Sequence, residues 1–209
     1  MQTDSRAEQL VRAAETGEAA LVDRLLGEGV PADAYGAEKR TALDLAVRHG
    51  HGAVVRLLVA AGADPDQRAG EWGELNVLTL AATFSRTDIA RVLLDAGAHP
   101  DARCRIGFPL LLASTCTDPG PTCPEIVDLL LDRGADIGQR LRDLTSLEWA
   151  VWFRLPDMVR QLLGRGAEPS AHALELAHER MGRCPEARQD CERVIEALRV
   201  AGAPERMGR

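Results

Sequence analysis

Aromatic residues are scarce in this sequence. Its 209 residues include three tryptophans, one tyrosine and three phenylalanines, although 45% of all residues are hydrophobic. A broad globular core normally uses more of these large rings. The apolar residues are instead mainly alanine, leucine and valine, which suit short, closely packed helices. We therefore expect an all-α fold.

Long apolar runs are also missing. No run approaches the roughly 18 residues that a membrane-spanning helix needs, and residues 1–10 lack the basic-then-apolar pattern of a secretory signal. We expect a cytoplasmic protein without membrane contact, with its five cysteines reduced. The formal net charge of −7 opposes binding to phosphate backbones.

A short phrase that ends in glycine recurs along the whole chain. In the first five repeats two apolar residues, usually leucines, stand shortly before the glycine, and all six glycines lie 32 to 37 residues apart. The phrase ends at Gly29, Gly62, Gly97, Gly134, Gly166 and Gly202. The residue after a helix often adopts a left-handed conformation, which favours glycine. Each glycine is therefore predicted to follow the end of a helix.

Two helices are predicted in each repeat. Thr145 and Glu148 have the spacing of a capping box, which starts a helix. The segments 125–131 and 157–163 place apolar residues at i, i+1, i+4 and i+5, as on one face of a second helix. The pattern predicts a helix–turn–helix unit that repeats six times.

The second repeat has the most complete motif. It reads Thr41-Ala42-Leu43-Asp44-Leu45-Ala46, then Gly50-His51, and later Leu57-Leu58-Val59-Ala60-Ala61-Gly62-Ala63-Asp64. This pattern resembles the ankyrin-repeat family, whose repeat has 33 residues. The resemblance implies an ankyrin-repeat solenoid of stacked helix–turn–helix units joined by β-hairpin-like loops. It also implies a structural hydrogen-bonding role for His51.

The resemblance extends over nearly the whole chain, from about Ala7 to Ala203. It divides the chain into a tail at 1–6, a single ankyrin-repeat domain at 7–203 and a tail at 204–209. The approximate repeats are 7–34, 35–67, 68–102, 103–139, 140–168 and 169–203. Repeats four and six carry extra residues, at 114–123 and 178–190.

Cysteines in these two inserts are the main candidates for chemistry. Cys116 and Cys123 have six residues between them, and so do Cys184 and Cys191. Zinc sites usually space their cysteines by two to four residues. We expect no catalytic residue, metal or cofactor. The alternative is an enzyme or metal-binding protein that uses these inserts.

The few aromatic residues are unevenly placed on the repeat. Trp149 aligns with Leu45 and Leu80, so we expect it in the core. Phe84, Trp152 and Phe153 fall just before the turn between the two helices, where repeat two has Arg48 and His49. Tyr35 and Trp72 map to hairpins, and Phe108 lies at the junction of a hairpin with a helix.

Arginines are concentrated near the same hairpins. They are Arg40, Arg68, Arg103, Arg105, Arg140 and Arg142. Tryptophan, tyrosine and arginine often anchor protein interfaces, and guanidinium groups bind carboxylates in a fork geometry. The combination indicates a site for a partner protein with an acidic and partly apolar surface.

We therefore interpret the chain as a monomeric, non-catalytic protein–protein interaction module that binds through the concave face of its hairpins and first helices. The predicted binding residues are Tyr35, Arg48, His49, Trp72, Phe84, Arg103, Arg105, Arg140, Trp152 and Phe153. Two alternatives stay open. Trp152 and Phe153 could fill space beneath the repeat-four loop, or the hairpin arginines could bind nucleic acid against the net charge.

Overall fold

The computed structural model of the chain describes residues 2–36, 38–70, 73–115, 123–183 and 185–204. The chain divides into two compact units, Met1–Pro109 and Leu110–Arg209. Each unit is built mainly from pairs of helices, and each is described by itself.

The first unit contains three pairs of helices. Their bounds are α1 (Gln2–Thr16), α2 (Ala19–Gly27), α3 (Ala42–His49), α4 (Gly52–Ala60), α5 (Val77–Thr83) and α6 (Thr87–Asp95). A two-stranded antiparallel hairpin, β1 (Arg68–Ala69) with β2 (Leu75–Asn76), precedes α5. In register, Arg68 faces Asn76 and Ala69 faces Leu75.

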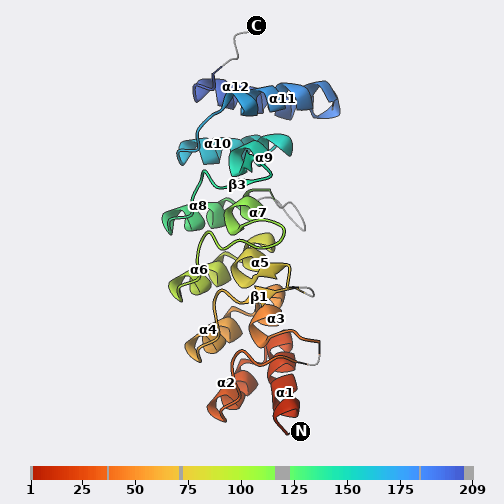
Figure 1. The fold of residues 1–209 in the computed structure, drawn as a ribbon, viewed down its shortest axis with the longest axis vertical. Coiled ribbons are helices and arrows are strands. Elements are labelled where there is room, and N and C mark those ends of the chain that lie inside the picture. The colour runs from red at the N-terminus through yellow and green to blue at the C-terminus, as the bar shows by residue number, and fades with distance from the viewer. Residues whose placement is uncertain (1, 37, 71–72, 116–122, 184, 205–209) are drawn as a thin grey trace. The chain divides into compact units, whose positions relative to one another are not determined.

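Within this unit the first helices and the second helices pack in two rows (Figure 1). Helix α3 contacts α1 and α5, and α4 contacts α2 and α6. Helix α6 buries Ile89, Ala90, Leu93 and Leu94, at the i, i+1, i+4 and i+5 spacing of one helix face. The core therefore lies between the two rows and between successive pairs.

The second unit contains the remaining helices. Their bounds are α7 (Pro109–Thr115), α8 (Pro124–Asp132), α9 (Ser146–Trp152), α10 (Pro156–Gly164), α11 (Ala171–Arg183), a 3₁₀ turn η1 (Pro185–Ala187) and α12 (Arg188–Val200). Strands β3 (Arg140–Leu141) and β4 (Leu144–Thr145) form the hairpin before α9. Helix α9 contacts α10 and α11, and α12 contacts α10 and α11.

Local sequence explains where these helices begin and end. Thr41, Asn76 and Thr145 cap α3, α5 and α9 with side-chain oxygens that accept a backbone N–H. Thr145 and Glu148 form the predicted capping box. All six glycines predicted to follow a helix have positive φ angles, between 85° and 97°.

Two aromatic residues differ from the sequence prediction. Trp149, predicted to be core, is only half-buried, because its indole Nε1 reaches the hairpin and donates to the carbonyl of Leu141 at 3.2 Å. Phe108, which the sequence placed at the junction of a hairpin with a helix, is fully buried and not half-buried. In the part of the chain that is described, no helix has the length and apolar character needed to cross a bilayer.

Candidate functional site

In the first unit, an arginine and an aromatic ring meet where α3 and α5 end. Phe84 is the C-cap of α5, and Arg48 lies in the last turn of α3. The guanidinium carbon of Arg48 lies 5.7 Å from the centroid of the Phe84 ring, within the range of a cation–π contact. Both side chains are half-buried. The structure thus brings together two residues that the sequence predicted for the same surface.

His49 lies beside this pair and is exposed. Its ring stacks on His51, with centroids 6.2 Å apart and planes 20° apart. The Nε2 atom of His51 is 2.9 Å from the carbonyl oxygen of Glu15 in α1. The hydrogen-bonding role that the resemblance implied for His51 is confirmed.

The turns that precede α3 and α7 carry further predicted residues of this unit. Tyr35 is 65% exposed, and its backbone forms a bridge with Thr41. Arg103 and Arg105 are exposed, and the N–H of Arg105 donates to the carbonyl of Glu74 at 2.9 Å. Predicted site residue Trp72 lies outside the described residues.

Ile106, which was not among the residues predicted from the sequence, is 48% exposed in the turn next to Arg105. It adds an exposed apolar side chain to the arginines of this turn. The signal was present in the sequence, because an isoleucine directly before Gly107 falls within a predicted hairpin and outside any helix.

In the second unit, a cluster of rings covers the end of α9. Phe153 is 46% exposed and stacks on Trp149, with centroids 6.1 Å apart and planes 25° apart. Trp152 is half-buried, and the guanidinium carbon of Arg180 lies 4.5 Å from its ring centroid. We call Trp149, Trp152, Phe153 and Arg180 the α9 aromatic cluster. Trp149 and Arg180 were not among the predicted binding residues.

Arg140 belongs to the hairpin before α9 and is exposed. Its Nη1 donates to the backbone carbonyl of Asp143 at 2.7 Å. Arg142 and Asp143, at the tip of the same hairpin, both have left-handed φ angles, of 51° and 64°. Part of the Arg140 guanidinium therefore stabilises its own tight turn.

Arg40 departs from the expectation for the hairpin arginines. Its side chain is only 11% exposed and forms an ion pair with the buried carboxylate of Asp44. The hydrogen bond to Asp44 raises the pKa of the Arg40 guanidinium above its usual value, although burial acts in the opposite direction. This arginine is part of the interior between repeats and is not a surface anchor.

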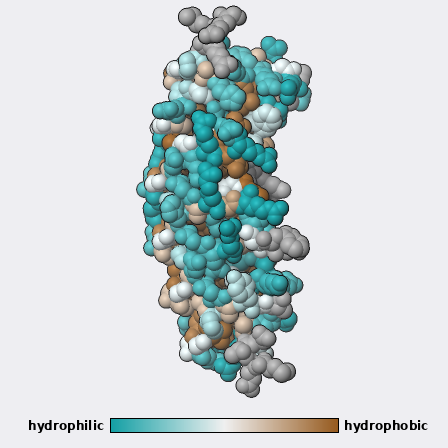
Figure 2. Space-filling model, viewed as in Figure 1, coloured by the Kyte–Doolittle hydropathy of each residue, from teal (hydrophilic) through white to brown (hydrophobic). Residues whose placement is uncertain are grey.

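The predicted binding residues therefore divide between the two units. Tyr35, Arg48, His49, Phe84, Arg103 and Arg105 belong to the first unit, and Arg140, Trp152 and Phe153 to the second. Figure 2 shows a mostly hydrophilic face on which hydrophobic residues form small patches. Chemically, each unit offers ring surfaces with adjacent guanidinium groups, an arrangement suited to protein contacts.

The cysteines give no metal centre in the described part. There, no group of three or more histidine, cysteine or acidic side chains could hold a metal ion. Cys123 contacts Glu125 with 3.3 Å between Sγ and Oε2, and Cys191 is buried in α12. Cys116 and Cys184 lie outside the described residues, so the expectation for the two inserts stays a prediction.

Comparisons with known proteins bear on the fold. Residues 10–104 match the family model described as ankyrin repeats in three copies. The chain is similar to the human ASB11 ankyrin repeat domain, with 23% identity, a TM-score of 0.75, and coverage of 93% of this chain and 84% of that one. It is also similar to the ankyrin repeat domain of Bcl-3, a unique member of the IkappaB protein family. That match has 29% identity, a TM-score of 0.77, and coverage of 93% of this chain and 86% of that one.

No curated protein matches the sequence. The similarity in structure nevertheless spans nearly the whole chain, although the family match covers residues 10–104 alone. The predicted all-α, ankyrin-type fold is confirmed.

Proposed function

The chain belongs to the ankyrin-repeat family, whose domains are general protein–protein interaction modules, and we propose that it binds a partner protein without catalysing a reaction. The proposed binding surface consists of the exposed ends of the first helices and the adjacent hairpins. In the first unit it includes Tyr35, Arg48, His49, Phe84, Arg103 and Arg105, and in the second unit Arg140, Trp149, Trp152, Phe153 and Arg180. Trp72 lies outside the described residues and stays a prediction.

The α9 aromatic cluster is the observation that carries this proposal. A chain with few aromatic residues has three rings within a single helical turn, and Phe153 is 46% exposed. Large rings bury much area at a small entropic cost, and they dominate the binding energy of many interfaces. The second unit is therefore the proposed centre of the contact.

The basic residues of this surface define the proposed partner. Arg103 and Arg105 are exposed beside Ile106, and Arg48 and Arg180 lie against rings. Guanidinium groups match carboxylates in a fork geometry. A partner surface that carries acidic side chains around an apolar patch would match these groups.

A crosslinked pull-down from a lysate of the native host, followed by affinity measurements with the purified prey, tests the proposal. One variant combines Tyr35→Ala with Phe84→Ala in the first unit, and another combines Trp152→Ala with Phe153→Ala in the second. Arg24→Ala on the exposed surface of α2 is the control. Helical circular dichroism verifies that every variant is folded.

We expect the wild type and the control to capture the same prey, and the second-unit variant to lose it. Removal of an anchoring ring costs about 2 kcal/mol, or roughly 30-fold in Kd. A prey that binds all folded variants with equal affinity would contradict the proposed surface. If only the first-unit variant failed to capture the prey, the contact would instead depend on Tyr35 and Phe84.

A further inference from the structure

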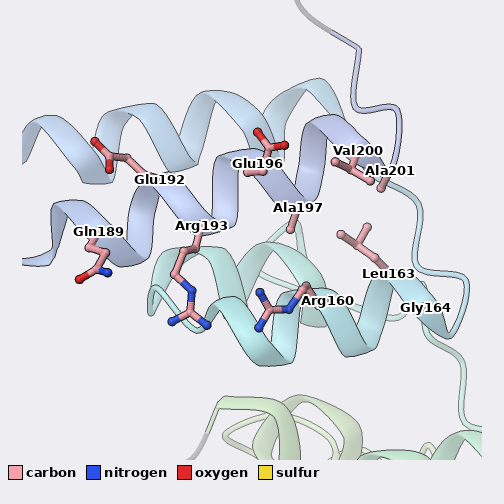
Figure 3. A pocket seen from close by; sticks show the side chains of 10 residues that line it. All are labelled: Arg160, Leu163, Gly164, Gln189, Glu192, Arg193, Glu196, Ala197, Val200 and Ala201. Carbon is pink, nitrogen blue, oxygen red and sulfur yellow. The ribbon is translucent and has the colours of Figure 1, made fainter.

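The outer face of the second unit has a groove of about 800 Å³ between α10 and α12. Figure 3 shows the side chains that line it. Leu163 and Val200 lie at one end, Gln189 and Glu192 lie at the other, and Ala197, Arg160 and Arg193 lie between them. These positions belong to second helices and are separate from the surface proposed above.

The groove is open because small residues meet along it. Gly164 on α10, Ala197 on α12 and Ala201, the C-cap of α12, all line it. Ala197 and Ala201 lie one and two turns after Arg193, on the same side of α12. Side chains of this size leave space between the two helices.

Long side chains bridge the neighbouring seam of the same unit, between α8 and α10. Between α8 and α10, Arg165 forms ion pairs with Asp128, at 3.0 Å, and with Asp132. The side-chain amide of Gln161 also donates to the carbonyl of Pro124 at 2.8 Å. Arg193 bridges the α10–α12 seam in a similar way, through its ion pair with Asp157, but Gly164, Ala197 and Ala201 leave space beside it.

An exposed apolar side chain stands at the open end of the groove. Val200 is 79% exposed, the highest value among the exposed large hydrophobic side chains of the described residues. Leu163, which faces the same space, is half-buried. An apolar side chain of a partner that entered here would cover both residues, and burial of apolar area is favourable.

The charges around the groove leave one carboxylate without a counterion. Asp157 accepts from both Arg160 and Arg193, and Glu192 pairs with Arg188 at 2.9 Å. Glu196, which lies one turn before Val200, has no ion pair within the described part of the chain. The groove lining itself carries two arginines, Arg160 and Arg193, and two glutamates, Glu192 and Glu196, so its formal charges balance, and among these four only Glu196 has no ion pair in the described part of the chain.

We propose that the α10–α12 groove docks an amphipathic helix of a partner protein, with basic residues beside its apolar stripe. The apolar residues enter the part lined by Leu163, Ala197 and Val200, and a lysine or arginine reaches Glu196. An amphipathic helix in a groove is a common mode of recognition. This partner chemistry is opposite in charge to the one proposed for the hairpins and first helices, so the chain has two separate docking surfaces.

The test uses two designed peptides and the purified full chain. One peptide is a fluorescein-labelled helix of about 15 residues, long enough to be partly helical alone, with leucines on one stripe and lysines on both sides. Its twin carries glutamate in place of every lysine. Fluorescence anisotropy measures the affinity of each peptide, and circular dichroism verifies each protein variant.

We expect the lysine peptide to bind the wild type about tenfold more tightly than its twin, which corresponds to a single well-placed charge contact. Ala197→Leu fills the hollow and weakens binding about tenfold. Glu196→Lys removes or reverses the preference between the peptides. Glu168→Lys makes the same charge change outside the groove and leaves the preference as in the wild type.

Equal binding of the two peptides by the wild type would overturn the proposal, as would unchanged binding by Ala197→Leu and Glu196→Lys. Sedimentation equilibrium identifies another occupant: a wild-type dimer that Ala197→Leu dissociates would assign the groove to a second copy of the chain and overturn the proposal. The variant with Trp152→Ala and Phe153→Ala keeps its peptide binding if the groove is the site. Loss of peptide binding in that variant alone would place the peptide on the first-helix surface instead.

Discussion

The ring of His51 covers Gly17, the residue that joins α1 to α2. A Cβ atom at Gly17 would stand only 2.6 Å from Nδ1 of His51. The opposite ring nitrogen, Nε2, is 2.9 Å from the carbonyl oxygen of Glu15. His51 of the second repeat therefore packs against the turn between α1 and α2 in the first repeat. Arg86 has the same relationship with Gly50, where an added Cβ would lie 2.8 Å from the guanidinium carbon.

This contact predicts that two glycines with similar backbones differ in tolerance to alanine. Gly17 and Gly29 have φ angles of 81° and 86°, but a Cβ at Gly29 meets nothing within 4 Å. Gly29→Ala should destabilise the fold by about 1 kcal/mol, the cost of the left-handed conformation. Gly17→Ala should cost about 3 kcal/mol, because overpacking against His51 is added. Urea denaturation monitored by circular dichroism compares the two variants.

A double-mutant cycle supplies the control. In a His51→Ala background the ring is absent, so Gly17→Ala should cost no more than Gly29→Ala. An equal cost of Gly17→Ala with and without the ring would show that backbone strain alone determines it.

Short-range patterns explain why much of the fold was predictable from sequence. The glycines after the helices and the pair Thr145 and Glu148 act within a few residues of their own helix, so spacing alone identifies them. The role of His51 was predicted from the resemblance of Gly50-His51 to the ankyrin-repeat motif. The aromatic positions at the ends of α5 and α9 were predicted in the same way.

Contacts between repeats were harder to predict. Arg180 lies in α11 and contacts Trp152 in α9. Because α11 has 13 residues and α9 has seven, the sequence did not show which residues of repeat six lie opposite those of repeat five. The ion pair of Arg40 with Asp44 depends on burial, which composition does not reveal. The α10–α12 groove forms where small side chains leave space between the two helices. A repeat pattern in the sequence does not show how well neighbouring helices fill the space between them.

The carboxylate of Glu148 links two repeats of the second unit. Glu148 is buried, and its Oε2 accepts from the N–H and the hydroxyl of Thr145 at 2.9 and 3.2 Å. Its Oε1 accepts from the hydroxyl of Ser170 at 2.9 Å, and that hydroxyl oxygen in turn accepts the N–H of Ala173 in α11. One side chain therefore supports the starts of both α9 and α11.

Glu148→Ala should destabilise the protein by about 3 kcal/mol, because it removes a cap and leaves the half-buried donors of Thr145 and Ser170 without this acceptor. Ser170→Ala, which removes only the link to α11, should cost about 1 kcal/mol. Differential scanning calorimetry measures both. Glu168→Ala changes an exposed glutamate of the same unit and serves as the control. A Glu148→Ala effect no larger than that of Glu168→Ala would show that this network adds no stability.

Two arginines with similar partners are predicted to respond differently to salt. Arg40 pairs with Asp44 in the interior of the first unit, and Arg165 pairs with Asp128 and Asp132 on the surface of the second. In each case a hydrogen bond to an aspartate raises the pKa of the guanidinium above its usual value. A raised pKa gives stability that is complete below the unfolded value and is lost only as the pH rises through the folded value. Neither pair therefore makes stability depend on pH near neutrality, and salt is the informative variable.

Arg40→Met leaves the carboxylate of Asp44 buried with only the N–H of Gly70, at 3.2 Å, as a remaining donor. We expect a loss of about 3 kcal/mol that persists in about 1 M NaCl, because buried pairs are weakly screened. Arg165→Met should lower the Tm less, and its effect should disappear at the higher salt concentration, since the Debye length falls to about 3 Å at about 1 M and exposed pairs are then largely screened. Thermal unfolding at about 0.05 M and about 1 M NaCl separates the two. If salt reduced both effects to the same extent, the Arg40 pair would be as accessible to ions as the Arg165 pair, and its burial could not explain its contribution.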